Sequence, residues 1–301
     1  MMRLSFCGTA VRAGLVESLR RDDGSGKGVC GGLAMRNGVT KRGGTALNLA
    51  PMTDTSPTRR IVPQTGPHLW SGATLSPSDW MLPLGAEAGT EIEAALADPA
   101  HPMPRLTPLL SEVADRLAHG MGFCLMRGLP QLADPEALLR LLGSRIGAPI
   151  ALPPSQGALH AEPCDALLLL CCARAEMALE SAAARHNALM KSDRAALEAL
   201  YRPLPQREGP DRPVFVLHHG VFAARLDETA AAAEAAAALT ALRATADPAL
   251  PLRITLHPGD LLAVNPFLVW AGRQEGFTTL ALRMEPTRLM GPFAVPAEDT
   301  R

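Results

Sequence analysis

Short strand-like segments separated by turns fill the second half of this chain, and they constrain its fold more than any other feature. Turn sequences such as His219-Gly220 and Pro258-Gly259-Asp260 lie between them. One long Ala-rich stretch, Glu228–Ala246, interrupts the series and is predicted to be a helix. Short strands with a helical insert favour an α+β fold, a double-sheet jelly roll with flanking helices. The predicted strands cover 166–172, 214–217, 253–256, 261–265 and 278–284.

Local sequence signals also predict regular structure in the preceding part of the chain, from about Trp70 onwards. Apolar residues recur at helical spacing before Gly120, which is placed as a helix stop. Asp134 is placed as an N-cap, and Pro135 fits the first position of the helix that follows. The predicted helices cover 91–96, 106–119 and 135–142, and an apolar run bounded by glycines predicts a buried strand at 122–129.

Residues 1–51 differ from the rest of the chain. They hold ten glycines, eight Arg or Lys residues, three Asp or Glu residues and no sustained apolar periodicity. Such a segment buries too little apolar surface to offset the entropy of ordering it. Three interpretations stay open: a disordered tail, a transit-like peptide, or sequence upstream of a true start at Met52. We favour the start at Met52.

Composition narrows the classes of partner and compartment. A formal net charge of -1 argues against nucleic acid or an anionic membrane as the main partner. No run of 18 apolar residues is present, so no membrane span is expected. The six cysteines show no zinc-binding spacing, and three lie in apolar runs, which predicts a reducing, cytoplasmic environment. The sequence leaves a homo-oligomer open.

His160-Ala161-Glu162, just before the strand predicted at 166–172, is a candidate metal-binding motif. On an extended segment, residues two apart turn their side chains to the same face. A histidine and a carboxylate placed in this way form half of the two-histidine, one-carboxylate site that binds non-haem Fe(II) and leaves positions open for O₂ and a co-substrate. The second histidine is expected near Gly272-Arg273, where this chain has Ala271.

Several stretches, in this order along the chain, resemble the taurine dioxygenase-like (TauD/TfdA) family of Fe(II)/2-oxoglutarate-dependent oxygenases. The resemblance covers roughly residues 106–290 and implies a clavaminate synthase-like double-stranded β-helix that uses iron and 2-oxoglutarate to act on a small molecule. The matching stretches are 122–130, 159–172, 184–189, 213–215, 258–261, 265–273 and 282–283.

The resemblance implies a role for individual residues. His160 matches the family's proximal histidine, and Glu162 takes the carboxylate position, where the family usually has aspartate. Arg283 matches the arginine that pairs with the distal carboxylate of 2-oxoglutarate, a task suited to a planar bidentate donor. Ala271 replaces the distal histidine. The stretch Glu176–Ser181 stands where the family has Gly-Gly-x-Ser/Thr, which helps to hold the co-substrate.

The chain has other histidine and cysteine side chains that could take the place of the missing histidine. We expect the remaining histidines of this region to be structural, with His186 starting or capping a helix. Cys164 is the least implausible substitute ligand. Trp270 is bulky enough to fill the space of the missing imidazole. The histidines considered are His186, His218, His219 and His257.

Two classes of function follow. The first is an Fe(II)/2-oxoglutarate-dependent oxygenase with a degenerate metal site, acting on an unknown small molecule. The second is a catalytically inactive relative that uses the old pocket to bind a small molecule or a partner. The expected organisation is a leader (1–51), an N-terminal arm with helices (52–105) and an oxygenase-like domain (106–301).

Overall fold

The computed structural model describes residues 61–131, 133–152, 161–206, 210–227, 231, 233–272 and 276–294. All of them belong to the compact unit Arg59–Arg301. The predictions for the leader, for His160 and for Arg273 lie outside the described residues. No helix in the described part of the chain is long and apolar enough to cross a membrane.

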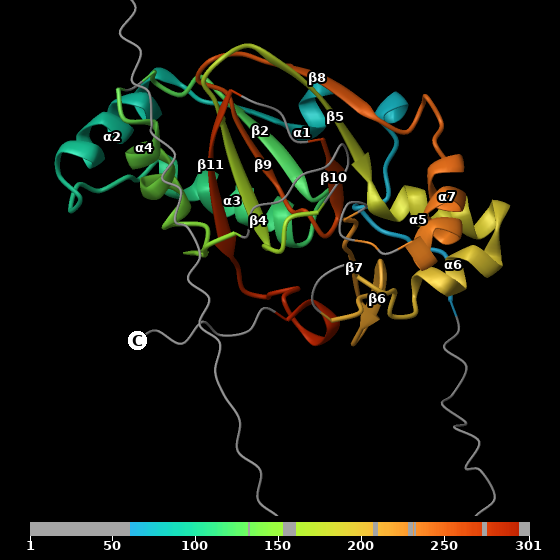
Figure 1. Ribbon diagram of the computed structural model, residues 1–301. Coiled ribbons are helices and arrows are strands. Elements are labelled where there is room, and N and C mark those ends of the chain that lie inside the picture. The colour runs from blue at the N-terminus through green and yellow to red at the C-terminus, as the bar shows by residue number, and fades with distance from the viewer. Residues whose placement is uncertain are drawn as a thin grey trace, which may run out of the picture. The chain divides into compact units, whose positions relative to one another are not determined.

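A six-stranded sheet forms the centre of the fold (Figure 1). Strand β1 pairs with β2 in parallel, and every other pairing in this sheet is antiparallel. Segments distant in sequence therefore lie side by side, as in the pairing of Leu168 with Ala263. In spatial order the strands are β1 (Met81–Pro83), β2 (Phe123–Arg127), β9 (Leu261–Val264), β4 (Ala166–Cys171), β11 (Phe277–Arg283) and β3 (Ala148–Pro149).

Three helices, α2 (Ala86–Ala97), α3 (Leu106–Ala118) and α4 (Pro135–Gly143), cover one face of this sheet. The side chain of Asp134 caps α4 by accepting a hydrogen bond of 2.9 Å from the backbone N–H of Ala137. At the end of α4, a Cβ added to Gly143 would lie 2.6 Å from a methyl group of Leu280, so glycine permits close packing of helix on sheet. Buried leucines of α3 and alternate residues of β2, β4 and β9 complete this layer.

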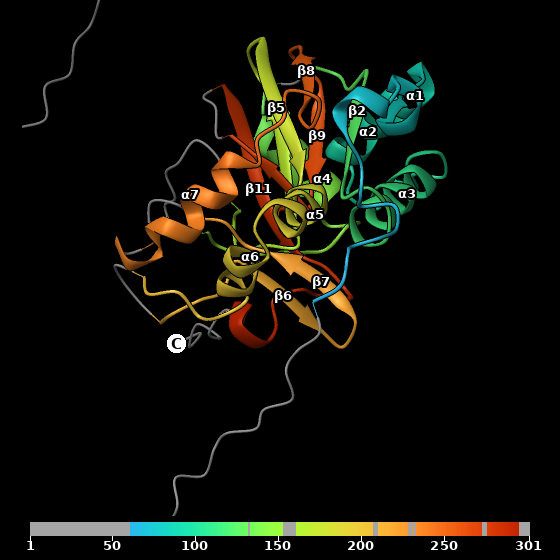
Figure 2. The same ribbon diagram turned by 90° about the vertical axis from the view of Figure 1, so that its right-hand side faces the viewer.

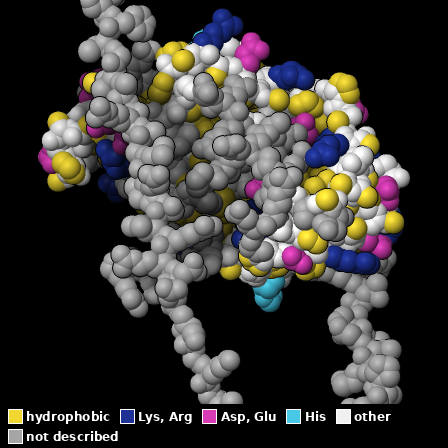
Figure 3. Space-filling view, in the orientation of Figure 1, with side chains coloured by type: hydrophobic (Ala, Val, Ile, Leu, Met, Phe, Trp, Pro, Cys, Tyr) yellow, Lys and Arg dark blue, Asp and Glu magenta, His cyan; other side chains and the backbone are white. Residues whose placement is uncertain are grey.

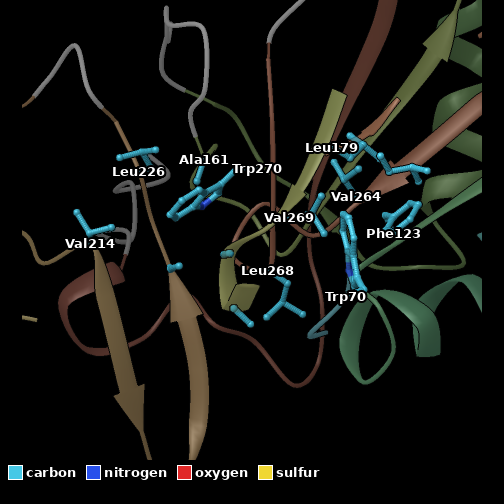
Figure 4. Packing of buried hydrophobic residues seen from close by; sticks show 14 of the residues in the cluster. Trp70, Phe123, Ala161, Leu179, Val214, Leu226, Val264, Leu268, Val269 and Trp270 are labelled. Carbon is cyan, nitrogen blue, oxygen red and sulfur yellow. The ribbon is translucent and has the colours of Figure 1, made fainter. Parts of the chain in front are cut away.

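A three-stranded antiparallel sheet, in the order β10-β5-β8, packs on the other face of the large sheet. Met177 and Leu179 of the small sheet share one apolar cluster with Phe123 and Val264 of the large sheet, part of which Figure 4 shows. The fold therefore has two sheets facing each other across a core. The strands are β5 (Ala175–Ser181), β8 (Leu252–Leu256) and β10 (Val269–Ala271).

The helices α5, α6 and α7 and a hairpin of β6 and β7 lie at the opposite end of the molecule from α2–α4 (Figures 1 and 2). The ring of Phe215 in β6 stacks on that of Trp270 in β10, and the two ring centroids lie 6.0 Å apart. The bounds are α5 (Ala182–Ser192), α6 (Arg194–Leu200), β6 (Phe215–His218), β7 (Val221–Ala224) and α7 (Ala236–Ala244). The remaining short elements are η1 (Gly72–Thr74), α1 (Pro77–Trp80), η2 (Ala233–Ala235) and η3 (Gly291–Phe293).

Acidic and basic side chains are interspersed over the described part of the face drawn in Figure 3. Charged surfaces that bind nucleic acid usually gather one sign on one face. The mixed pattern on this face agrees with the formal net charge of -1.

The predicted mixture of helices and strands is confirmed, and the double-stranded β-helix stays a prediction. Two expectations need correction. The Ala-rich helix α7 begins at Ala236 rather than Glu228, after the short η2; residues 228–230 lie outside the described part. His186 neither starts nor caps a helix: it lies inside α5, whose N-cap is Ser181, because the Ser181 hydroxyl accepts the backbone N–H of Ala184.

Candidate functional site: a cavity between the two sheets

A cavity lies between the two facing sheets and holds about 590 Å³ of empty space, part of it open to solvent. Its walls are mostly apolar side chains from alternate positions of β4, β9, β10 and β11. Because strand side chains alternate between faces, the lining residues of β4, β10 and β11 stand two positions apart. The lining residues are Leu152, Glu162, Leu167, Leu169, Met177, Val264, Pro266, Val269, Ala271, Gly272, Phe277 and Thr279.

Glu162 is the one acidic side chain among these lining residues, and only 5% of its surface is exposed. The segment that carries it is held on both sides. The N–H of Ala161 donates to the carbonyl of Leu226 at 2.7 Å, and the N–H of Asp165 donates to that of Leu282 at 3.0 Å. The turn before β4 therefore fixes the backbone from which the Glu162 carboxylate reaches the cavity.

The Asp165 carboxylate strengthens this anchor. Its oxygens accept the backbone N–H groups of Met284 (3.0 Å) and Arg288 (2.6 Å) and the hydroxyl of Thr287 (2.7 Å). A buried carboxylate with three donors is well compensated. Asp165 thus ties the segment before β4 to the chain that leaves β11, and its role in the fold is structural.

Ala271 lines the same cavity from the end of β10, where it pairs with Leu179 of β5. Glu162 and Ala271 therefore line one cavity. A methyl group offers no donor to a metal ion, so this wall of the cavity supplies no ligand from position 271.

Trp270 turns to the opposite side of β10 from Ala271. It is not a lining residue of the cavity; its ring is fully buried and stacks on Phe215. Figure 4 shows Trp270 beside Ala161 and Leu226. The expectation that Trp270 fills the space of the missing imidazole is wrong, because consecutive strand residues face opposite ways.

Arg283 stands at the end of β11, is exposed, and is not among the lining residues of the cavity. Phe277 and Thr279 of the same strand do line it, so Arg283 shares their face by alternation but lies further along the strand. The role of Arg283 toward 2-oxoglutarate stays a prediction.

The described residues alone do not form a complete iron site. No group of three histidine, cysteine, aspartate or glutamate side chains among them could hold a metal ion. Glu162 is one donor of the right chemistry, His160 lies outside the described residues, and Ala271 adds nothing. Cys164 does not line the cavity, and burial, together with the nearby Glu162 carboxylate, raises the pKa of its thiol well above the ordinary value.

None of the other histidines considered lines the cavity. His186 is fully buried, lies 2.9 Å from the hydroxyl of Tyr201 and 3.1 Å from the side-chain oxygen of Asn187, and has a pKa lowered by burial. His219 occupies the β6–β7 turn with a φ of 48°. Sequence reasoning missed the lining residues Met177 and Thr279, although strand alternation is the signal that identifies them.

No family model and no curated protein matches this sequence. Solved structures of similar fold include non-haem iron oxygenases. OrfP in complex with Fe and L-Arg is 15% identical over 70% of this chain and 99% of its own, with a TM-score of 0.50. Asparagine oxygenase with Fe(II), 2S,3S-3-hydroxyasparagine and succinate is 18% identical over 68% and 93%, with a TM-score of 0.50. A second structure of asparagine oxygenase (AsnO) is 17% identical over the same shares, with a TM-score of 0.51.

At these identities the likeness concerns the fold. The chain is thus built like non-haem iron oxygenases. Membership of the taurine dioxygenase-like family itself stays a prediction.

Proposed function

We propose that the protein is an Fe(II)/2-oxoglutarate-dependent oxygenase of the taurine dioxygenase-like kind, built on a double-stranded β-helix and acting on a small molecule. The observation that carries the proposal is that Glu162 and Ala271 line one cavity. These are two of the three positions that the family resemblance assigns to metal ligands. The solved structures of similar fold were obtained in complex with Fe and L-Arg, or with Fe(II), 2S,3S-3-hydroxyasparagine and succinate, which supports iron and 2-oxoglutarate as cofactors.

In this proposal His160 and Glu162 hold the metal and Arg283 pairs with 2-oxoglutarate. Iron bound with 2-oxoglutarate supplies the power to oxidise a substrate with O₂. The protein's own contribution is an apolar, partly enclosed cavity that excludes water from one carboxylate. The metal site is degenerate, because Ala271 has replaced the third ligand.

A second candidate function is a non-catalytic protein that binds a small molecule or a partner in the same cavity. Ala271 favours this second function. Losing a residue that only hydrogen-bonds to a metal ligand typically weakens metal binding by roughly 10–100-fold, and losing one of the three ligands themselves should weaken it more. The apolar walls also suit an organic ligand without a metal.

An anaerobic titration of purified protein with Fe(II), with and without 2-oxoglutarate, tests the first proposal. We expect weak Fe(II) binding that Glu162→Gln abolishes. Glu176→Gln, which changes an exposed carboxylate of β5, is the matched control and leaves binding unchanged. Consumption of 2-oxoglutarate without added substrate is the second measurement. If the protein neither binds Fe(II) nor consumes 2-oxoglutarate, the oxygenase proposal is excluded and the non-catalytic binding protein is the proposal that stands.

A further inference from the structure

A second pocket lies next to the segment that carries Glu162. It holds about 390 Å³ of empty space, part of it open to solvent. The exit of β7 and the chain around Val214 form its walls, together with Leu239 of α7. The lining residues are Leu204, Gln206, Arg212, Pro213, Val214, Arg225, Leu226, Asp227, Ala231 and Leu239.

Two arginines, Arg212 and Arg225, line this pocket from backbones that are fixed in place. The N–H of Arg225 donates to the carbonyl of Val214 at 2.8 Å. Arg212 exchanges two backbone hydrogen bonds of 3.0 Å with Leu204. The two guanidinium groups are thus carried by neighbouring chain segments that are tied to the fold.

The guanidinium donors are unused within the described part of the chain. Neither Arg212 nor Arg225 donates a side-chain hydrogen bond to a described protein group. Each guanidinium has five N–H donors arranged for planar, bidentate partners such as carboxylates. Neither side chain is among the fully buried polar groups that lack a partner, so an acceptor from outside the chain would take the place of solvent at these donors.

Electrostatics point the same way. Burial, and then the like charge of Arg212, lower the pKa of Arg225 to about 10, while the carboxylates of Asp227 and Glu162 partly offset this effect. The cationic form of Arg225 is thus less favourable in this pocket than in water. An anion between the two guanidinium groups would offset both the desolvation cost of the Arg225 cation and its repulsion by Arg212.

We propose that Arg212 and Arg225 form a binding site for the carboxylate of a small organic acid. The remaining wall holds one carboxylate, Asp227, and is otherwise mostly leucine, valine and proline side chains, so the site fits an acid with a carbon skeleton better than inorganic phosphate, which carries more negative charge than a single carboxylate group. The site adjoins the central cavity, because Leu226, next to Arg225, accepts the N–H of Ala161, next to Glu162. The assignment requires no metal and does not depend on the proposed oxygenase activity.

Calorimetric titration of the full chain in the presence of a metal chelator tests the site. The probes are succinate, 2-oxoglutarate and inorganic phosphate. We expect at least one of the two acids to bind more tightly than phosphate. Arg225→Gln and Arg212→Gln should each weaken that binding about tenfold or more, the usual loss for a hydrogen bond to a charged group. Arg225→Lys keeps the positive charge but not the planar guanidinium that binds a carboxylate through two hydrogen bonds, so it should give an intermediate loss of affinity.

Arg253→Gln is the matched control, because Arg253 is an exposed arginine of β8 that lines neither pocket. It should change the affinity less than about twofold, within the range of a screened surface charge. Failure of both acids to bind would overturn the proposal, as would equal losses in Arg253→Gln and Arg225→Gln or preferential binding of phosphate. Near-ultraviolet circular dichroism checks that each variant is folded. If Arg225→Gln does not fold, the affinity of Arg212→Gln decides the outcome. Since no metal is present, failure here is distinct from failure of the oxygenase proposal.

Discussion

Glu162 and Ala271 line one cavity although they come from distant parts of the sequence, one before β4 and the other at the end of β10. The position that the iron motif would fill with a histidine is therefore open to the same space as the carboxylate. Trp270 does not obstruct it, because its ring is buried on the other side of β10. This relationship makes restoration of the metal site a direct experiment.

Ala271→His should raise the affinity for Fe(II) by at least about tenfold, because it adds an imidazole to the wall that shares the cavity with Glu162. Equilibrium titration under anaerobic conditions measures the change. Ala178→His is the control, since Ala178 lies on β5 next to Leu179, the partner of Ala271, but does not line the cavity. Equal gains in both variants would show that the cavity is not the metal site.

Trp270→Ala should destabilise the protein by about 3–5 kcal/mol, the usual cost of deleting a buried tryptophan side chain. Trp270→Phe should cost less, because it keeps a ring against Phe215 and because the buried indole nitrogen has no hydrogen-bond partner among the described residues. Urea denaturation gives both values. Neither substitution should alter Fe(II) affinity as long as the variant is folded, and a large change in affinity would contradict the orientation of Trp270.

His186 makes the stability of the fold depend on pH. Burial lowers its pKa below the ordinary value of 6.5, so below pH 6.5 the unfolded chain takes up a proton that the folded protein does not. Stability should then fall as the pH drops, by at most about 1.4 kcal/mol per pH unit for this group. Urea denaturation of wild type and His186→Gln at pH 7.5 and 5.5 isolates the effect, which should be smaller in the variant. An identical pH dependence in both proteins would show that His186 does not contribute.

The elements that sequence predicted well are those with local signals. The N-cap Asp134 and the apolar spacing of α3 depend on residues within one helix, and the run at β4 is almost entirely apolar. Strand β5 was missed, although Met177 and Leu179 alternate there with Glu176 and Glu180. A short charged strand of this kind has too little apolar content to be recognised without its partners.

The candidate sites could be predicted only in part, for a physical reason. The pattern His160-x-Glu162 is local and can be recognised in the sequence, and the family resemblance identifies Ala271 as the matching position. No local sequence pattern predicts the pair of Arg212 and Arg225. The segments that carry them are brought together by the backbone hydrogen bond from Arg225 to Val214. A site that forms only when distant segments of the chain approach each other in the fold cannot be recognised from one sequence.

Arg283 provides the last test, because its sequence position and its structural position point in different directions. The resemblance assigns it to 2-oxoglutarate, yet it is exposed at the end of β11 and does not line the cavity. If Arg283 holds the co-substrate, Arg283→Gln should weaken 2-oxoglutarate binding by about tenfold or more, the value of a charge-assisted hydrogen bond. Calorimetric titration of the metal-loaded and metal-free protein measures it, with Arg253→Gln as the exposed-arginine control. If Arg225→Gln weakens 2-oxoglutarate binding and Arg283→Gln does not, the acid binds in the second pocket and Arg283 is a surface residue.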